Sequence, residues 1–399
     1  MNVLERFLKY VSYGTNSDED CEECPSSPKQ LELAEYLKNE LEGIGVSGVQ
    51  KDGKGYVYGF IPGEGALAGE KPIGFIAHMD TSPSVPGDNI KASVVNYNGG
   101  DILLADGKTV ISEADFPEIK ALSGERLVVT DGTTLLGADD KAGVAEIVTL
   151  CERLMSVKNH RPVAVAFTPD EEIGRGTDFF SPERFGAREA YTIDGGIIGE
   201  IEYENFNAAS LSVRVSGVNI HPGSGKNRMK NAILLANEFI SMLPPFETPA
   251  HTEGYEGFYH ISSISGNETL CTFCGIIRDH DRCKFEERKA FALKIGEFLN
   301  EKYGEGTFMV EVSDSYYNMR EKIEPCMYLV DNAKKAFEKA GVEPRVVPIR
   351  GGTDGAHLSY MGVPCPNLST GGYNFHSCRE FIPVSAMEKM VEVLESLAE

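Results

Sequence analysis

Carboxylate and imidazole side chains recur where apolar, strand-like segments of this 399-residue chain end. The densest group is Asp170-Glu171-Glu172, which closely follows the apolar run at 163–167. Three neighbouring anions at the mouth of a buried sheet repel one another and resist ionisation. A metal ion is the simplest cation that would relieve this repulsion. Taken alone, the run also fits a solvated acidic turn.

Two further segments pair such residues. His78 and Asp80 follow the apolar run at 73–77. Residues two apart on a strand point the same way, so this carboxylate could orient a metal-binding imidazole. Asp139 and Asp140 stand where a strand gives way to a helix. A surface or core histidine and an aspartate helix cap are the ordinary alternatives.

Single residues of the same kind occur twice more. Asp194 ends a strand before two glycines, and His376 lies in a loop rich in Gly and Asn. Taken alone, Asp194 also fits a turn residue, and the loop around His376 decides nothing about its role. However, open α/β sheets bind ligands at the carboxyl ends of their strands. The joint occurrence of all five segments at such ends therefore predicts a metal site.

The segments that must position these residues alternate between strand and helix patterns. Ser27 and Gln30 form a capping-box pattern at the start of one helix. We expect an α/β sheet covered by helices on both faces. The expected strands are 56–61, 73–77, 126–130, 163–167, 190–193 and 345–348, and the expected helices are 1–11, 28–43, 141–154, 328–340 and the segment after 383.

A different order interrupts this pattern. Strand 209–216, helix 229–242, strands 258–265 and 269–278, helix 286–303 and strand 307–313 follow one another. This β-α-β-β-α-β order is that of a ferredoxin-like domain. We expect a discontinuous catalytic domain, 1–206 and 320–399, with a lid or substrate-binding domain, 207–319, inserted into it.

Composition narrows the possible partners. The formal net charge of −23 argues against nucleic acid and anionic membranes, whose phosphates attract basic surfaces. No apolar stretch is long enough to span a bilayer, and residues 1–11 lack the features of a secretory signal. We expect a cytoplasmic protein. The pairs Cys21/Cys24 and Cys271/Cys274 are better interpreted as reduced thiols than as a zinc or redox site.

The order of the motifs resembles that of the cocatalytic dizinc aminopeptidase family, which also contains carboxypeptidase G-like enzymes, aminoacylases and deacetylases. The motifs are H-x-D at 78–80, G-A-D-D-K-A-G at 137–143, D-E-E-I-G at 170–174, I-D-G-G at 193–196 and G-G-Y-N-F-H at 371–376. The likeness runs nearly end to end. It implies a zinc-peptidase-type mixed sheet sandwiched by helices, with an inserted ferredoxin-like α+β lid domain.

The resemblance implies two zinc ions per subunit, with Co²⁺ or Mn²⁺ as possible substitutes. Asp139 would bridge the ions, His78 and Asp194 would complete one site, and Glu172 and His376 would complete the other. With Glu171, the four carboxylates sum to −4, which two divalent ions (+4) balance.

Further roles follow from the same resemblance. Glu171 would be the general base and Asp80 would hold the imidazole of His78. In the inserted domain, His221 would polarise the scissile carbonyl, although it also fits an ordinary turn before proline. Arg278 would bind the carboxylate of a peptide, or else form a structural ion pair with Asp279. Arg350, in a Gly-rich segment, is a third substrate-binding candidate.

The implied activity is removal of the N-terminal residue from tripeptides by two zinc ions and a bridging hydroxide. Another dizinc amidohydrolase of the family is the alternative: a dipeptidase, an N-acyl amino acid hydrolase or a carboxypeptidase. A non-catalytic metal- or peptide-binding scaffold is disfavoured, because Glu171 and the five ligands are all present. The expected partner is a small peptide, and the protein is expected to be a monomer or a homodimer through the lid domain.

Overall fold

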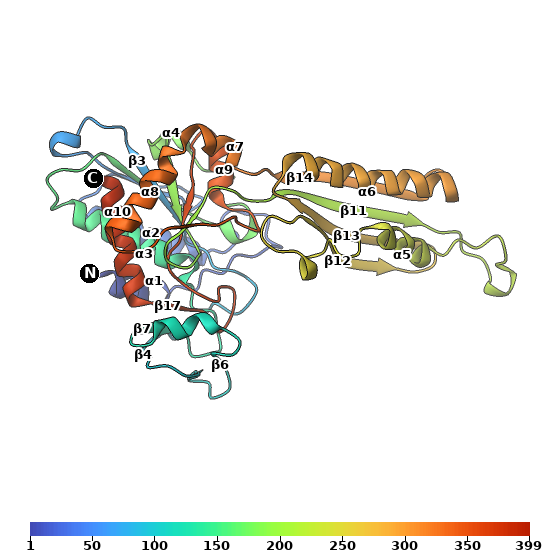
Figure 1. Ribbon diagram of the computed structural model, residues 1–399, viewed down its shortest axis with the longest axis horizontal. Coiled ribbons are helices and arrows are strands. Elements are labelled where there is room, and N and C mark those ends of the chain that lie inside the picture. Colours follow the sequence, from blue (N-terminus) through green and yellow to red (C-terminus); the bar gives the residue numbers. More distant parts are fainter. The chain divides into compact units, whose positions relative to one another are not determined.

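The computed structural model describes residues 1–399 and divides them into two compact units. Unit 1 comprises Met1–Tyr203, Glu321–Val347 and Thr353–Glu399. Unit 2 comprises Glu204–Arg320 and Pro348–Gly352. Figure 1 shows the helices and strands of both units, coloured along the chain. The protein is thus a mixed α/β protein with an α+β unit inserted into its sequence.

The short segment Pro348–Gly352 differs from the sequence-based boundaries, which assigned it to the first domain. It belongs to unit 2, where the backbone of Ile349 and the guanidinium of Arg350 form hydrogen bonds. Ile349 donates its N–H to the carbonyl of Glu204 at 2.8 Å, and Arg350 donates to the carbonyl of Gly254 at 2.8 Å. A segment of a few residues carries too little pattern for the sequence to reveal this packing.

Unit 1 is built on a mixed eight-stranded sheet with the order β1-β2-β8-β3-β9-β16-β10-β15. The strands are β1 (Ser47–Lys51), β2 (Val57–Ile61), β3 (Ile73–His78), β8 (Val163–Thr168), β9 (Ala190–Ile193), β10 (Glu200–Glu202), β15 (Arg345–Val346) and β16 (Asn367–Leu368). β3 pairs in parallel with both β8 and β9. The carboxyl ends of these three strands therefore meet at one edge of the sheet.

Helices cover this sheet. Every residue of β3 and β8 is buried, as expected for strands covered on both faces. α3 (Ala138–Leu154) packs against β3 and β9, and α1 (Val3–Tyr10) and α10 (Val384–Ala398) pack against α3. A separate apolar cluster joins Ile76 of β3 to Leu358 of α9 (Asp354–Tyr360) and Phe185 of α4 (Pro182–Phe185). α8 (Tyr328–Lys339) packs against α10.

The strand expected at 126–130 forms, but outside the central sheet. It is β7 (Arg126–Val129), which lies between β17 (Phe381–Pro383) and β4 (Ser93–Asn96) in a three-stranded antiparallel sheet. Leu127 and Val129 pack there in a small core of their own. The region also contains β5 (Ile102–Leu103), β6 (Val110–Ile111) and the 3-10 helix η2 (Pro117–Leu122).

The start of α2 (Lys29–Ile44) differs from the expected capping box. Its N-cap position is Pro28, and no side chain caps the helix. Gln30 is instead buried and donates from Nε2 to Oδ1 of Asp170 at 2.7 Å. Gln30 therefore bonds the distant carboxylate of Asp170 instead of capping its own helix.

Unit 2 has the split β-α-β order that the sequence predicts. Its four-stranded antiparallel sheet has the order β12-β13-β11-β14, and α5 and α6 pack against it (Figure 1). β11 alternates buried and exposed residues, and its buried residues share one core with both helices. The bounds are β11 (Asn207–Ser216), α5 (Ala232–Met242), β12 (Phe258–Gly266), β13 (Leu270–Asp279), α6 (Arg282–Tyr303) and β14 (Phe308–Tyr316).

None of the helices combines the length and the apolar character that crossing a bilayer requires. All nine cysteines are free. Cys271 is buried and Cys274 is exposed, as expected for two residues that point to opposite faces of β13.

Candidate metal centre

Three neighbouring strands of unit 1 deliver acidic and imidazole side chains to one place. β3 ends at His78 and is followed by Asp80, while β9 is followed directly by Asp194. β8 leads into the 3-10 turn η3 (Glu171–Ile173). Because β3 lies between β8 and β9, these residues gather at the carboxyl edge of the sheet, as the sequence predicts.

Two histidines approach opposite oxygens of one carboxylate, that of Asp139. Nε2 of His78 lies 3.0 Å from Oδ1, and Nε2 of His376 lies 3.2 Å from Oδ2. His78 also lies 3.5 Å from Oδ1 of Asp194, and His376 lies 2.9 Å from Oε2 of Glu172. The result is two groups of possible metal ligands, each with its ligand atoms within 4.8 Å of one another, that share Asp139.

The electrostatics of this cluster fit divalent cations. Burial and the charge of Asp194 raise the pKa of Glu171 well above its ordinary value. Burial and the charge of Asp139 raise the pKa of Glu172 to about 7, and the same two causes raise that of Asp194. Oε1 of Glu172 is buried without a hydrogen-bond partner. Crowded carboxylates beside imidazoles are a donor set that two divalent ions would satisfy.

Glu171 stands apart from both ligand groups. Its Oε2 lies 3.9 Å from Nε2 of His78, farther than the carboxylate oxygens of the shared cluster. The neighbouring Glu172 belongs to a ligand group and Glu171 does not. The two adjacent glutamates therefore occupy different positions and have different neighbours.

The carboxylate of Asp80 contacts the acidic turn as well as His78, which the sequence did not suggest. Its Oδ1 lies 3.3 Å from Nδ1 of His78, which fits the expected orienting role. In addition, Oδ1 accepts the N–H of Glu171 at 3.0 Å and Oδ2 accepts the N–H of Glu172 at 3.1 Å. One buried carboxylate thus connects the imidazole of β3 to the backbone of the acidic turn.

The remaining acids near the cluster have other tasks. Oδ2 of Asp140 accepts the backbone N–H of His78 at 3.0 Å, so Asp140 anchors β3 while Asp139 faces the histidines. Asp170 does not cap its own turn. Its buried carboxylate accepts the N–H of Ser26 at 2.8 Å and Nε2 of Gln30 at 2.7 Å, which ties the turn to the start of α2.

Glu380 and Asn367, which the sequence did not point to, support two of the candidate ligands. The carboxylate of Glu380 accepts the backbone N–H groups of Ala138 and Asp139. Nδ2 of Asn367 donates to the carbonyl of Asp194 at 2.8 Å and to Oε2 of Glu202 at 2.7 Å. The one available signal for Glu380 was a carboxylate directly before the apolar strand β17.

Two of the other candidate residues, His221 and Arg278, lie within unit 2. His221 is exposed, and its Nδ1 accepts the N–H of Gly223 at 3.2 Å, which is a local turn contact. Arg278 does not pair with Asp279, which bonds Arg288 at 2.7 Å instead. The guanidinium of Arg278 donates to the carbonyls of Ala209 and Ile277 and lies 5.4 Å from the ring centre of Tyr316.

Arg350 has a structural position in unit 2. Its Nη1 donates to the carbonyls of Gly254 and Glu256, and its Nη2 donates to the carbonyl and the hydroxyl of Thr252. The guanidinium also lies 5.0 Å from the ring centre of Phe206. These contacts assign Arg350 to holding the loop at 252–256.

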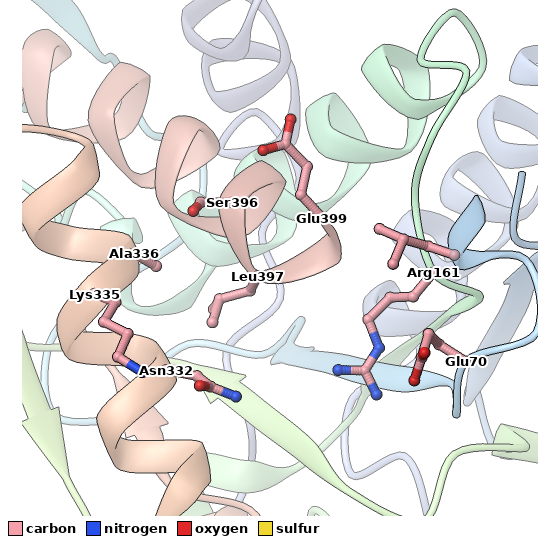
Figure 2. Close-up of a pocket in the computed structure, with 9 residues that line it drawn as sticks. Glu70, Arg161, Asn332, Lys335, Ala336, Ser396, Leu397 and Glu399 are labelled. Carbon is pink, nitrogen blue, oxygen red and sulfur yellow. The ribbon is translucent and has the colours of Figure 1, made fainter. Parts of the chain in front are cut away.

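A cavity elsewhere in unit 1 lacks comparable chemistry. It measures about 330 Å³ and lies near the chain's last residues, with Arg161 and Lys335 in its wall (Figure 2). Arg161 already donates to the carbonyl of Lys71 at 2.8 Å and to Glu189 at 3.0 Å. Figure 2 shows no histidine and no paired carboxylates among its labelled residues, so the Asp139 cluster remains the candidate site.

The fold and the shared-carboxylate cluster agree with the comparison to known families. The chain belongs to peptidase family M20/M25/M40, whose model matches residues 128–399. The protein is therefore a member of a family of peptidases.

Individual relatives extend this likeness over the whole chain. Peptidase T of Halothermothrix orenii is 54% identical over 402 residues, which cover 100% of this chain and 98% of that protein. The crystal structure of aminopeptidase PepT from Bacillus cereus superposes with a TM-score of 0.78 at 23% identity, covering 100% of this chain and 97% of that one. A dinuclear metal-binding M20 peptidase from Bacillus subtilis has a TM-score of 0.64 at 15% identity, with 99% and 97% covered.

Proposed function

We propose that this protein is a metallo-aminopeptidase that removes the N-terminal residue from tripeptides. The observation that carries the proposal is the carboxylate of Asp139, which offers one oxygen to each of two His–carboxylate groups while Glu171 remains outside both. The tripeptide substrate is suggested by relatives named Peptidase T that match the full chain.

The residues fit two divalent ions, of which zinc suits the mixed His and carboxylate donors best. His78, Asp139 and Asp194 would hold one ion, and Asp139, Glu172 and His376 the other. When bound, such a pair polarises a carbonyl and makes water easier to deprotonate.

Glu171 is the proposed proton carrier. Its carboxylate takes a proton from the attacking water and returns it to the amine of the departing residue. Asp80 fixes the Glu171 backbone through the hydrogen bond to its N–H and so aims the side chain. From unit 2, Arg278 is proposed to bind the terminal carboxylate of the peptide, and His221 to donate a hydrogen bond to the developing oxyanion.

The test is hydrolysis of matched di-, tri- and tetrapeptides by the zinc-loaded enzyme, each with a free and an acetylated N-terminus. Cleavage restricted to free-amine tripeptides supports the proposal. Hydrolysis of the acetylated set would overturn it in favour of an N-acyl amino acid hydrolase or a related amidohydrolase of the family.

A single variant separates the base from the ligands. Glu171→Gln should abolish turnover while metal analysis still finds two ions, because Glu171 is outside both ligand groups. Glu172→Gln is the matched control, since the same chemical change one residue on should weaken metal binding. Activity of the Glu171→Gln enzyme equal to that of wild type would refute the assigned role.

A further inference from the structure

Glu380 collects four successive backbone N–H groups on one carboxylate. Its Oε2 accepts from Leu136 at 2.7 Å and Gly137 at 2.9 Å. Its Oε1 accepts from Ala138 at 2.7 Å and Asp139 at 3.1 Å. The residue is 1% exposed. Consecutive N–H groups that converge in this way form an anion-binding nest, and here the anion is a side chain of the same protein.

This nest stands where α3 has no cap of its own. The N-cap position is Gly137, which has a φ of +80° and no side chain, and the next turn is irregular because Asp139 and Asp140 have non-helical backbone dihedral angles. Unpaired amides at a buried helix start are costly, so some acceptor is required. Glu380 supplies it from more than 240 residues away in the sequence.

Glu380 also ends the loop that carries His376. Tyr373 and Phe381 exchange backbone hydrogen bonds of 2.9 and 3.1 Å, which close the loop on either side of His376. Directly after Glu380, β17 pairs with β7. One residue therefore joins the backbone of Asp139 to the base of the His376 loop.

The two ligand groups depend on this connection unequally. In the group of His78, Asp139 and Asp194, only Asp139 lies on a segment that Glu380 holds. In the group of Asp139, Glu172 and His376, two of the three ligands do. A loosened connection would thus disturb the second group more than the first.

We propose that Glu380 is a positioning residue that sets the spacing between Asp139 and His376 and thereby the affinity of the ion held with Glu172. The inference rests on the proposed metal pair and extends it to a residue outside the ligand set. Loss of a residue that orients ligands typically weakens metal binding by about 10–100-fold.

The test measures zinc retention rather than turnover. Zinc-loaded wild type, Glu380→Gln and Glu146→Gln are equilibrated with graded chelator buffers, and bound zinc is counted. Two ions with different affinities give two zinc-binding steps, each with its own dissociation constant. A His376→Ala enzyme identifies which of these steps belongs to the His376 group. Glu146 is the matched control, because it is a fully buried glutamate of α3 whose carboxyl oxygens accept and donate no hydrogen bond.

In Glu380→Gln, one amide oxygen replaces two acceptors and an NH₂ group faces N–H donors. We expect the His376 step to weaken by about 10–100-fold, the other step to weaken less, and Glu146→Gln to keep both constants. Glu380→Asp, which keeps the charge on a shorter side chain, should lie between wild type and Glu380→Gln. It also provides the measurement if Glu380→Gln does not fold.

Unchanged constants in both Glu380 variants would overturn the inference, and so would an equal weakening of both steps. Failure of the proposed function appears elsewhere in the same experiment, as a wild-type enzyme that does not retain two zinc ions.

Discussion

Glu146 in the middle of α3 offers a stability test that does not involve the candidate metal ligands. It is 0% exposed, and neither carboxyl oxygen has a hydrogen-bond partner. An unsatisfied buried polar group costs about 1–3 kcal/mol. Glu146→Met replaces the carboxyl with an unbranched apolar side chain that adapts to its surroundings. The free energy of unfolding should therefore rise by about 1–3 kcal/mol.

The same substitution should change the pH dependence of stability. Burial raises the pKa of Glu146 well above its ordinary value. Between the unfolded and the folded pKa, the folded state keeps a proton that the unfolded state has released. The contribution of Glu146 to the free energy of unfolding is therefore greatest below the unfolded pKa and falls by about 1.4 kcal/mol per pH unit through this window. Glu146→Met lacks this contribution, so its advantage should grow as pH rises.

The assay is urea unfolding of wild type, Glu146→Met and Glu146→Gln at about pH 5 and about pH 8, where differences between variants cancel the other titrating groups. Glu146→Gln cannot ionise, so its stability relative to wild type should also grow as pH rises. Because it keeps buried polar atoms, its free energy of unfolding should rise less than that of Glu146→Met. A Glu146→Met protein less stable than wild type at both pH values would refute the reasoning. A gap that does not change with pH would refute the linkage.

Three other substitutions test contacts around the candidate site. Asp80→Asn can accept only one of the two amides of the acidic turn, so kcat/KM should fall by about 10–100-fold with both ions retained in metal analysis. Asp170→Asn weakens the charged acceptor of Ser26 and Gln30 and should lower the free energy of unfolding by about 1.5–3 kcal/mol, measured by urea unfolding; wild-type stability would contradict this. Arg278→Lys loses bidentate geometry and should raise KM for tripeptides by about tenfold or more, whereas an unchanged KM would exclude the carboxylate-binding role.

The sequence revealed much of the acidic cluster because most of its members lie at or just beyond the end of a locally recognisable strand, whereas Asp139 lies at the start of α3 and His376 lies in a loop. His78, Asp194 and the Glu171-Glu172 pair all follow apolar runs that become β3, β9 and β8. Because β3 pairs in parallel with β8 and β9, the residues at the carboxyl ends of these strands lie close together.

The sequence could not reveal contacts between residues far apart in the chain. Glu380 bonds amides more than 240 residues earlier, and Asp170 bonds Gln30 across 140 residues. No periodicity or motif encodes such pairs. For the same reason, the local pattern at Ser27 and Gln30 suggested a capping box that the structure does not form.

The position of β16 in the central sheet has a consequence for synthesis of the protein. β16 (Asn367–Leu368) pairs with β9 on one side and β10 on the other, although both partners are translated more than 160 residues earlier. Until β16 leaves the ribosome, the edge of β9 that it covers has no strand to pair with. His376 follows a few residues later, so the nascent chain completes its sheet and its second ligand group at nearly the same moment, after all of unit 2 has been made.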